Sequence, residues 1–314
     1  MNNGGLLYLI RLYTVYNLCM PDPLSLLTDI NLDDLVNSVG WQGNPGLAKT
    51  LRVTFRGAAN KFARQMIEYD RLVASEGLPD ASRQFVKSYV QDIRVFGIEN
   101  VPATGPLLVL SNHPGMADTL CLFTSINRSD LRSIALDRPF LQSLPNISNH
   151  LFYIGEESSE RMAAVRKTAT HLRTGGAVLT FPAGKIEPDP DVYPGALESF
   201  NDWTDSAGVF MRFAPETRIV PVLVRNVLWG RVVKNPITKL KHDRMEREKL
   251  GAAFQLLAHV ILDLHPLHVK VQFSQPLTLS EIGSNELPII HAAVLARMRS
   301  LILNPPLGEG ISIL

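Results

Sequence analysis

Hydrophobic positions along the chain follow two different patterns. Up to about residue 90 they recur at helical spacing, and after it short continuous apolar runs alternate with helical stretches. Continuous apolar runs of this length are typical of strands buried on both faces of a parallel sheet. We therefore predict an α/β fold, with a mostly parallel central sheet flanked by helices over residues 91–314 and an N-terminal helical region over residues 1–90.

The N-terminal pattern predicts several helices that are separated by turns. An amphipathic stretch begins at Leu24 and continues to Val36, and residues 40–46 form a turn around Asn44-Pro45-Gly46. Residues 47–74 read as one long helix or as two, and residues 81–90 as another. This region carries no catalytic motif, so it covers the α/β domain, contacts a membrane, or does both.

The later pattern predicts strands that alternate with helices. The expected strands are residues 107–110, 134–136, 152–154, 178–181, 219–224 and 269–273, and the clearest helices are residues 159–173 and 254–264. Such alternation is what a mostly parallel sheet requires, because parallel neighbours need crossover connections.

Candidate chemistry stands directly after the first of these strands, where His113 precedes Asp118 by five residues. Pro114 suits the first turn of a helix, which places His113 at a strand-to-helix junction. An aspartate that accepts from one ring nitrogen fixes the histidine tautomer and leaves the other nitrogen free as a base. The alternative is that His113 and Asp118 only cap the start of the helix.

Two further strand ends carry unusual residues. The run that ends at Phe181 leads into a Pro/Gly turn with one cation, Lys185. Pro221 stands inside the strand predicted over residues 219–224, where it removes a ladder donor and so predicts a sheet edge or a site where something lies against the backbone. Three such strand ends predict one shared cleft.

The order and content of these segments resemble the glycerolipid acyltransferase superfamily, which includes lysophosphatidate and glycerol-3-phosphate acyltransferases. Asn112, His113 and Asp118 match its Asn-His-x4-Asp block. Phe181-Pro182-Ala183-Gly184-Lys185-Ile186 partly matches its Phe-Pro-Glu-Gly-Thr-Arg block, and Val220-Pro221-Val222 matches an apolar block around a proline. The resemblance spans roughly residues 90–275, and the order of the blocks makes it more specific than any single one.

The departures from the family pattern concern the acceptor. Ala183 and Ile186 replace the glutamate and arginine that the family uses to hold a phosphate, which leaves a lysophosphatidate acceptor in doubt. Lys185 restores some positive charge but not the bidentate fork of an arginine. The family's arginine block is also poorly matched, since the nearest arginines are Arg161 and Arg166. These face the cleft or lie on a solvated helix face.

The resemblance implies acyl transfer from an acyl thioester, acyl-CoA or acyl-acyl carrier protein, to a hydroxyl of a glycerolipid or related lipid acceptor. It needs no cofactor beyond that co-substrate and no metal. His113 is the expected general base, Asp118 orients it, and backbone amides around Gly184 stabilise the oxyanion. The expected substrate-binding residues are Asn112, Phe181, Pro182, Gly184, Lys185 and Pro221. Two rivals remain, a thioester hydrolase and a non-catalytic lipid-binding member.

The net charge, the cysteines and the first residues of the chain bear on its partners and its location in the cell. A net charge of +1 argues against a nucleic-acid partner. Cys19 and Cys121 offer neither a metal-ligand spacing nor a disulfide framework, which fits a reducing compartment. The residues after Met1 lack the positive region of a secretory signal. We therefore expect a cytoplasmic protein.

Two segments suggest contact with a membrane. Residues 6–20 are apolar and tyrosine-rich but shorter than the roughly twenty residues that a spanning helix needs, and Arg11 interrupts them. They lie in the membrane interface or pack on the protein's own core. Residues 231–249 are rich in Lys and Arg, which suits an anionic surface, but their interspersed carboxylates also suit a solvated helix start. The expected location is peripheral, on the cytoplasmic face of a membrane.

Overall fold

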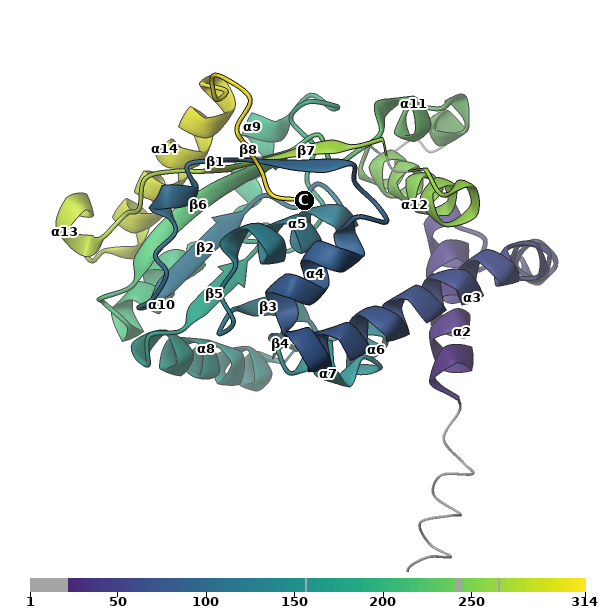
Figure 1. Cartoon of the computed structure of the whole chain (residues 1–314), viewed down its shortest axis with the longest axis horizontal. Coiled ribbons are helices and arrows are strands. Elements are labelled where there is room, and N and C mark those ends of the chain that lie inside the picture. The colour runs from purple at the N-terminus through teal and green to yellow at the C-terminus, as the bar shows by residue number, and fades with distance from the viewer. Residues whose placement is uncertain (1–21, 156, 241–243, 265) are drawn as a thin grey trace, which may run out of the picture. The chain divides into compact units, whose positions relative to one another are not determined.

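The computed structural model describes residues 22–314 except 156, 241–243 and 265 (Figure 1). The chain divides into two compact units, Met1–Ile67 and Glu68–Leu314, and the division falls inside helix α3 (Pro45–Glu76). Residues 6–20, for which we predicted an interfacial or packed helix, lie outside the described residues. The functional domain boundary near residue 90 stays a prediction.

Helix α2 (Pro23–Val39) and the first part of α3 make up the described part of the first unit. Gly40 caps the end of α2, and its left-handed backbone (φ 79°) lets its N–H donate to the carbonyls of Val36 and Asn37. Polar bonds between the helices include Asn60 to Thr28, at 3.3 Å. Residues 47–74, predicted as one helix or two, belong to a single helix.

In the described part of the chain, eight strands form one sheet in the order β4-β3-β5-β2-β6-β7-β1-β8. The strands are β1 (Asp92–Phe96), β2 (Leu107–Ser111), β3 (Arg132–Leu136), β4 (Leu151–Ile154), β5 (Ala177–Thr180), β6 (Arg218–Arg225), β7 (His268–Phe273) and β8 (Ile311–Ser312). From β4 to β6 every neighbouring pair is parallel, whereas β6 pairs antiparallel with β7. The predicted α/β class with a mostly parallel sheet is confirmed.

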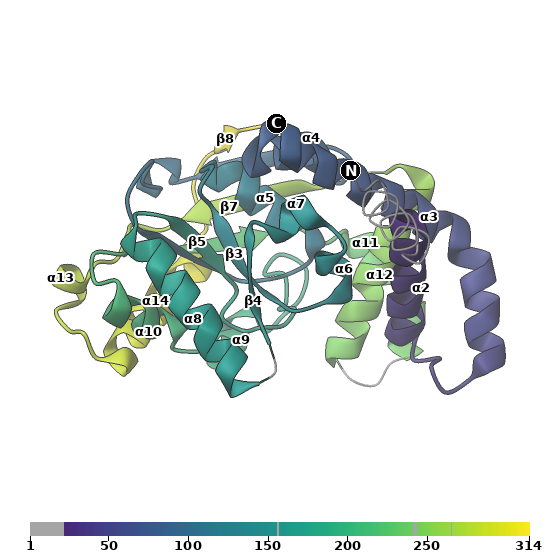
Figure 2. The ribbon, with the colours of Figure 1, turned by 90° about the horizontal axis from the view of Figure 1, so that it is seen from below.

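Helices cover both faces of this sheet (Figure 2). Helices α4 (Leu78–Val86) and α5 (Met116–Ile126) pack together on one face. The other face carries α8 (Ser158–Arg173), α10 (Ser206–Phe213) and α14 (Leu287–Leu303), whose apolar side chains form one buried cluster with Leu108 and Leu110 of β2. Burial on both faces explains why these strands read as continuous apolar runs.

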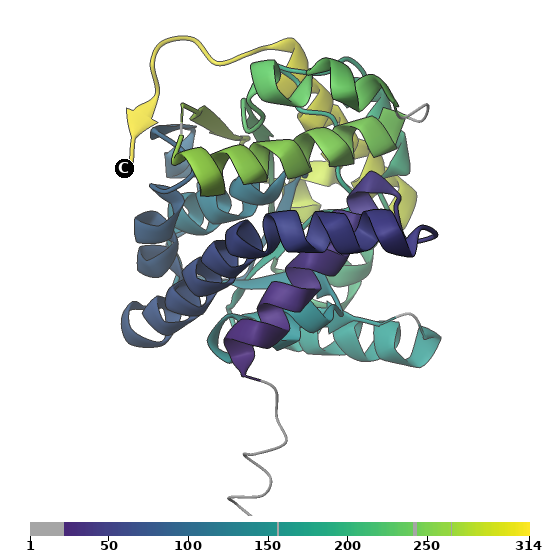
Figure 3. The same cartoon turned by 90° about the vertical axis from the view of Figure 1, so that its right-hand side faces the viewer.

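Shorter elements complete the second unit. They are η1 (Ile98–Asn100), α6 (Pro139–Gln142), α7 (Pro145–Ser148), α9 (Ala196–Ser199), η2 (Phe200–Asp202), α11 (Gly230–Val233), η3 (Pro236–Leu240), α12 (Arg244–Leu262) and α13 (Leu279–Ile282). Helices α11 and α12 lie side by side (Figure 3). Among the described residues, no helix combines the length and the apolar character that crossing a membrane requires.

Pro221 corrects one prediction, because it lies inside the sheet and not at its edge. Strand β6 pairs with β2 on one side and β7 on the other. The register shifts by one residue between Ile219↔Leu277 and Val222↔Phe273, so the segment after β7 carries an extra residue. This β-bulge interrupts the ladder opposite Pro221, which therefore costs no paired N–H.

Candidate active site

His113 follows the end of β2, and Asp118 stands in the first turn of α5. Nδ1 of the imidazole lies 2.9 Å from Oδ2 and 3.2 Å from Oδ1 of Asp118. Asp118 also accepts the N–H of Gly115, at 2.9 Å, and the hydroxyl of Thr119, at 3.0 Å. The carboxylate therefore caps the helix and also holds the histidine, and the role of His113 as a base stays a prediction.

The pair is buried unequally. Asp118 is fully buried, whereas 26% of the His113 side chain is exposed. Burial by itself lowers the pKa of His113, but the carboxylates of Asp118 and Glu187 outweigh this effect and raise the pKa above its usual value. With Nδ1 bonded to Asp118, Nε2 is the nitrogen that can meet a substrate hydroxyl.

The turn after β5 lies against the histidine. The ring of Phe181 stacks on the imidazole, with centroids 4.4 Å apart and an interplanar angle of 29°. Gly184 is exposed and has a left-handed backbone (φ 62°), and its N–H donates to the carbonyl of Phe181 at 3.0 Å. That N–H closes the turn, so Gly184 itself is not free to serve as the expected oxyanion donor.

The cation of this turn is already paired. Nζ of Lys185 lies 2.9 Å from Oδ2 of Asp202, and both side chains are about half exposed. Ala183 packs against the buried cluster beneath the turn. A phosphate at Lys185 would have to compete with Asp202, which weakens the expected replacement of the family's arginine.

Asn112 and Pro182 serve the framework of the site. The side-chain amide of Asn112 donates to the carbonyl of Val224 and accepts its N–H, both at 2.8 Å, which ties the ends of β2 and β6. Pro182 is buried, and its carbonyl accepts the N–H of Thr204. Contact of Asn112, Pro182 or Pro221 with substrate stays a prediction.

Glu187 was missed by the sequence analysis. Its side chain is 1% exposed, its Oε2 accepts the N–H of His113 at 3.1 Å, and its own N–H donates to the His113 carbonyl at 2.9 Å. Oε1 accepts from Trp203 and Ser199. Burial raises the pKa of Glu187 to about 7. The available signal was one acidic residue between Ile186 and Pro188, too slight to distinguish it from a solvated carboxylate.

Asp189 is a second buried carboxylate in the loop that follows β5. Its carboxylate is fully buried and accepts the backbone N–H groups of Asp191, Asn226, Val227 and Leu228. It thereby fixes the segment after β6. A Cβ at Gly115 would lie 3.4 Å from Leu228, so this segment packs against the start of α5. The ends of β2, β5 and β6 lie together, as predicted.

Comparison with known proteins identifies this part of the chain. Residues 92–225 match the family model described as Acyltransferase. This segment is an acyltransferase-family domain. It begins at the first residue of β1 and ends at the last residue of β6, so it contains His113, Asp118 and Glu187. The match confirms the family resemblance seen in the sequence blocks.

The other comparisons add little to this assignment. No curated protein matches the chain. Among solved structures, the 1-acyl-sn-glycerophosphate acyltransferase PlsC from Thermotoga maritima aligns with 76% of this chain and 96% of its own, at 15% sequence identity and a TM-score of 0.42.

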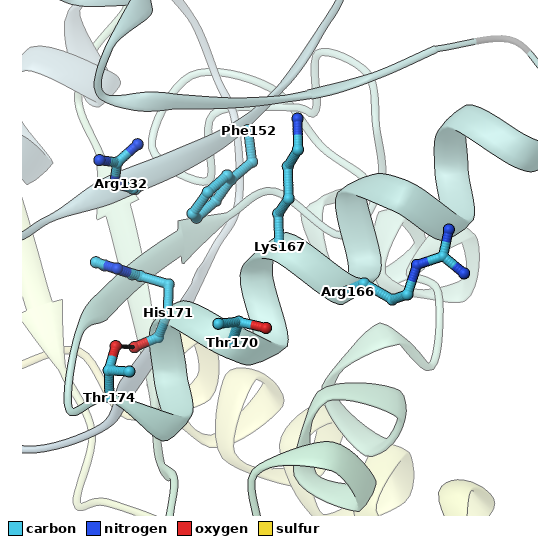
Figure 4. Close-up of a pocket in the computed structure, with 7 residues that line it drawn as sticks. All are labelled: Arg132, Phe152, Arg166, Lys167, Thr170, His171 and Thr174. Carbon is cyan, nitrogen blue, oxygen red and sulfur yellow. Dashed lines mark hydrogen bonds between the residues drawn. The ribbon is translucent and has the colours of Figure 1, made fainter.

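Figure 4 shows a separate hollow of about 440 Å³. It lies near the amino ends of β3 and β4, whereas His113 follows the carboxyl end of β2. Its lining residues are Arg132, Phe152, Arg166, Lys167, Thr170, His171 and Thr174. Arg161 and Arg166 are both exposed on α8, which favours the solvated helix face that was one reading of the sequence.

Proposed function

We propose that this acyltransferase domain moves a fatty acyl group from an acyl thioester, acyl-CoA or acyl-acyl carrier protein, to a hydroxyl of a glycerolipid or related lipid acceptor. The pairing of His113 with the buried Asp118, at 2.9 Å, carries the proposal. It lies at the carboxyl ends of parallel strands, where ligands bind in open α/β sheets.

In the proposed reaction, Nε2 of His113 takes the proton of the acceptor hydroxyl as its oxygen attacks the thioester carbonyl. The C–O bond forms, the tetrahedral intermediate collapses, and the C–S bond breaks. The imidazolium returns the proton to the leaving thiolate, giving an ester and a free thiol. Asp118 stabilises the imidazolium in between, as a buried carboxylate does in other histidine bases.

The block Phe181–Ile186 bears on the choice of acceptor. The Lys185–Asp202 pair, at 2.9 Å, neutralises the one cation that the block contains. A phosphomonoester in the acceptor would need to displace Asp202, whereas a neutral or zwitterionic headgroup would not. We therefore favour a lipid acceptor that offers a hydroxyl and does not depend on a phosphate for binding.

We also propose that the protein works peripherally on the cytoplasmic face of a membrane. In segment 231–249, Arg231 and Lys234 are exposed, and cations near an anionic surface contribute on the order of 1 kcal/mol each. Binding to vesicles with and without anionic lipid, by sedimentation, tests this part. Equal binding to neutral and anionic vesicles, or none to either, would contradict it.

The test of the reaction is acceptor-dependent thiol release. The purified protein is given long-chain acyl-CoA or acyl-acyl carrier protein, alone and with a panel of lysolipid and amine-lipid acceptors. The thiol is followed by a chromogenic reagent and the product by mass spectrometry. Release that requires an acceptor and yields its ester supports transfer. Release without acceptor would indicate a hydrolase, and bound acyl ligand with no release would indicate a lipid-binding protein.

A further inference from the structure

The carboxylate of Glu187 makes a two-way connection with the backbone of His113. Its Oε2 accepts the His113 N–H at 3.1 Å, while the Glu187 N–H donates to the His113 carbonyl at 2.9 Å. Residues 113 and 187 are thereby paired although they lie on loops that follow different strands, β2 and β5. The backbone on both sides of the imidazole is fixed by one residue.

The same loop also holds the imidazole ring. Phe181 at its start stacks on the His113 ring, with centroids 4.4 Å apart, and Glu187 at its end bonds the His113 backbone. Asp118 holds Nδ1 from the α5 side. The histidine is therefore held at its ring face, its backbone and its inner nitrogen, which leaves Nε2 in a defined place.

The surroundings of Glu187 suit a carboxylate and not an amide. Among the described residues, its oxygens accept from three donors, the His113 N–H, the Trp203 indole and the Ser199 hydroxyl. Glutamine would present an NH₂ group to the indole or to the His113 N–H, and two donors cannot bond each other. The Ser199 hydroxyl can instead donate to the Ala196 carbonyl, at 2.9 Å. Its oxygen can then accept a proton from Oε1 of a protonated Glu187, so the protonated form also has a hydrogen-bond partner.

We propose that Glu187 is the positioning residue for the catalytic base, holding the His113 backbone so that the imidazole stays clamped between Asp118 and Phe181. The inference rests on the proposed function, in which His113 is the base. Glu187 does not touch the reacting atoms, so it acts through His113.

The Glu187 carboxylate also affects the charge state of the His113 imidazole. Among the described residues, Asp118 from α5 and Glu187 from the loop after β5 are the charged groups that raise the pKa of His113. Cys121 lies further along α5, and burial raises the pKa of its thiol, so it stays neutral. Removing the Glu187 charge therefore lowers the pKa of His113, while Asp118 continues to hold Nδ1.

The test compares Glu187→Gln with Glu198→Gln, an exposed glutamate on the neighbouring helix α9. Folding is checked by circular dichroism and thermal unfolding. For Glu187→Gln we expect kcat to fall about 10- to 100-fold with KM for the thioester changed less than about threefold, and the acid limb of the pH profile to move to lower pH. Glu198→Gln should match the wild type.

An NMR titration of the His113 ring protons separates this inference from the proposed function, since it needs no turnover. A lower His113 pKa in Glu187→Gln, with wild-type behaviour in Glu198→Gln, supports the positioning role even where no acyl transfer is found. An unchanged titration in a folded Glu187→Gln would overturn it, whether kcat falls or not, because loosening of the fold alone does not move the charge at His113.

Glu187→Asp covers the case in which the glutamine variant does not fold. Aspartate keeps the charge but is one methylene shorter, so it cannot reach His113 and Trp203 together. We expect a folded protein whose His113 titration stays within about 0.3 pH units of the wild type and whose kcat falls about 10-fold. Wild-type kcat in this variant would overturn the proposal.

Discussion

The imidazole of His113 stacks on the ring of Phe181, with centroids 4.4 Å apart and an angle of 29° between the planes. The two residues follow different strands, β2 and β5, which are parallel neighbours. The contact therefore gives Phe181 a physical role, because it restricts rotation of the proposed base.

Loss of this contact should reduce turnover. We expect Phe181→Ala to lower kcat about 10-fold, since the imidazole gains freedom to leave its productive orientation. Phe181→Tyr keeps the stack and should stay within about threefold of the wild type. Thiol release at saturating acyl thioester measures both. Equal kcat for the alanine variant and the wild type would show that the stack does not matter.

Replacement of the orienting carboxylate should have a larger effect. Asp118→Asn keeps the shape but removes the charge that favours the imidazolium, so we expect kcat to fall about 100-fold or more. Thr119→Val is the matched control, because it removes one bond to the Asp118 carboxylate, of 3.0 Å, and leaves the charge. A fall of similar size in both variants would point to damage at the start of α5 and against a charge effect.

Much of the site was predictable because its signals are local. Leu107 to Leu110 read as a buried strand since both faces of β2 are covered, and His113 with Asp118 lie within one strand-to-helix junction. The approach of the strand ends of β2, β5 and β6 was predictable as well, because parallel strands with crossover helices bring their carboxyl ends to one side.

The residues that were missed or misread depend on long-range pairing. Glu187 and Asp189 are carboxylates in a proline-rich segment, and nothing local indicates that one bonds the backbone of His113 and the other the backbone after β6. For Pro221 the sequence left two alternatives, a sheet edge or a site where something lies against the backbone. The edge was wrong, since the bulge that accommodates the proline lies in residues 274–276, far along the chain.

Release of Lys185 should change acceptor preference. Asp202→Asn removes the carboxylate that lies 2.9 Å from the Lys185 ammonium. We therefore expect KM for phosphate-bearing acceptors to fall about 2- to 10-fold, while KM for neutral acceptors stays the same. Asp205→Asn, an exposed aspartate nearby, controls for the general change in charge. The same fall in KM for neutral acceptors would contradict this role of the ion pair.

The pH dependence of stability should report the burial of Glu187. Burial raises its folded-state pKa to about 7, above the usual value of 4.5, so its contribution is present below about pH 4.5 and is lost as the pH rises through about 7. The free energy of unfolding of the wild type relative to Glu187→Gln should therefore fall between about pH 5 and pH 8, by on the order of a few kcal/mol. Urea unfolding at both pH values measures it. A constant difference would mean that Glu187 titrates normally.

We propose His113 as the base that deprotonates the acceptor hydroxyl. Its most direct test is acceptor-dependent thiol release by the wild type, His113→Ala and His268→Ala, whose imidazole is exposed on β7. We expect His268→Ala to match the wild type and His113→Ala to lose acceptor-dependent release by about 1,000-fold or more while remaining folded. Acceptor-dependent release by His113→Ala at the rate of the wild type would show that His113 is not the base.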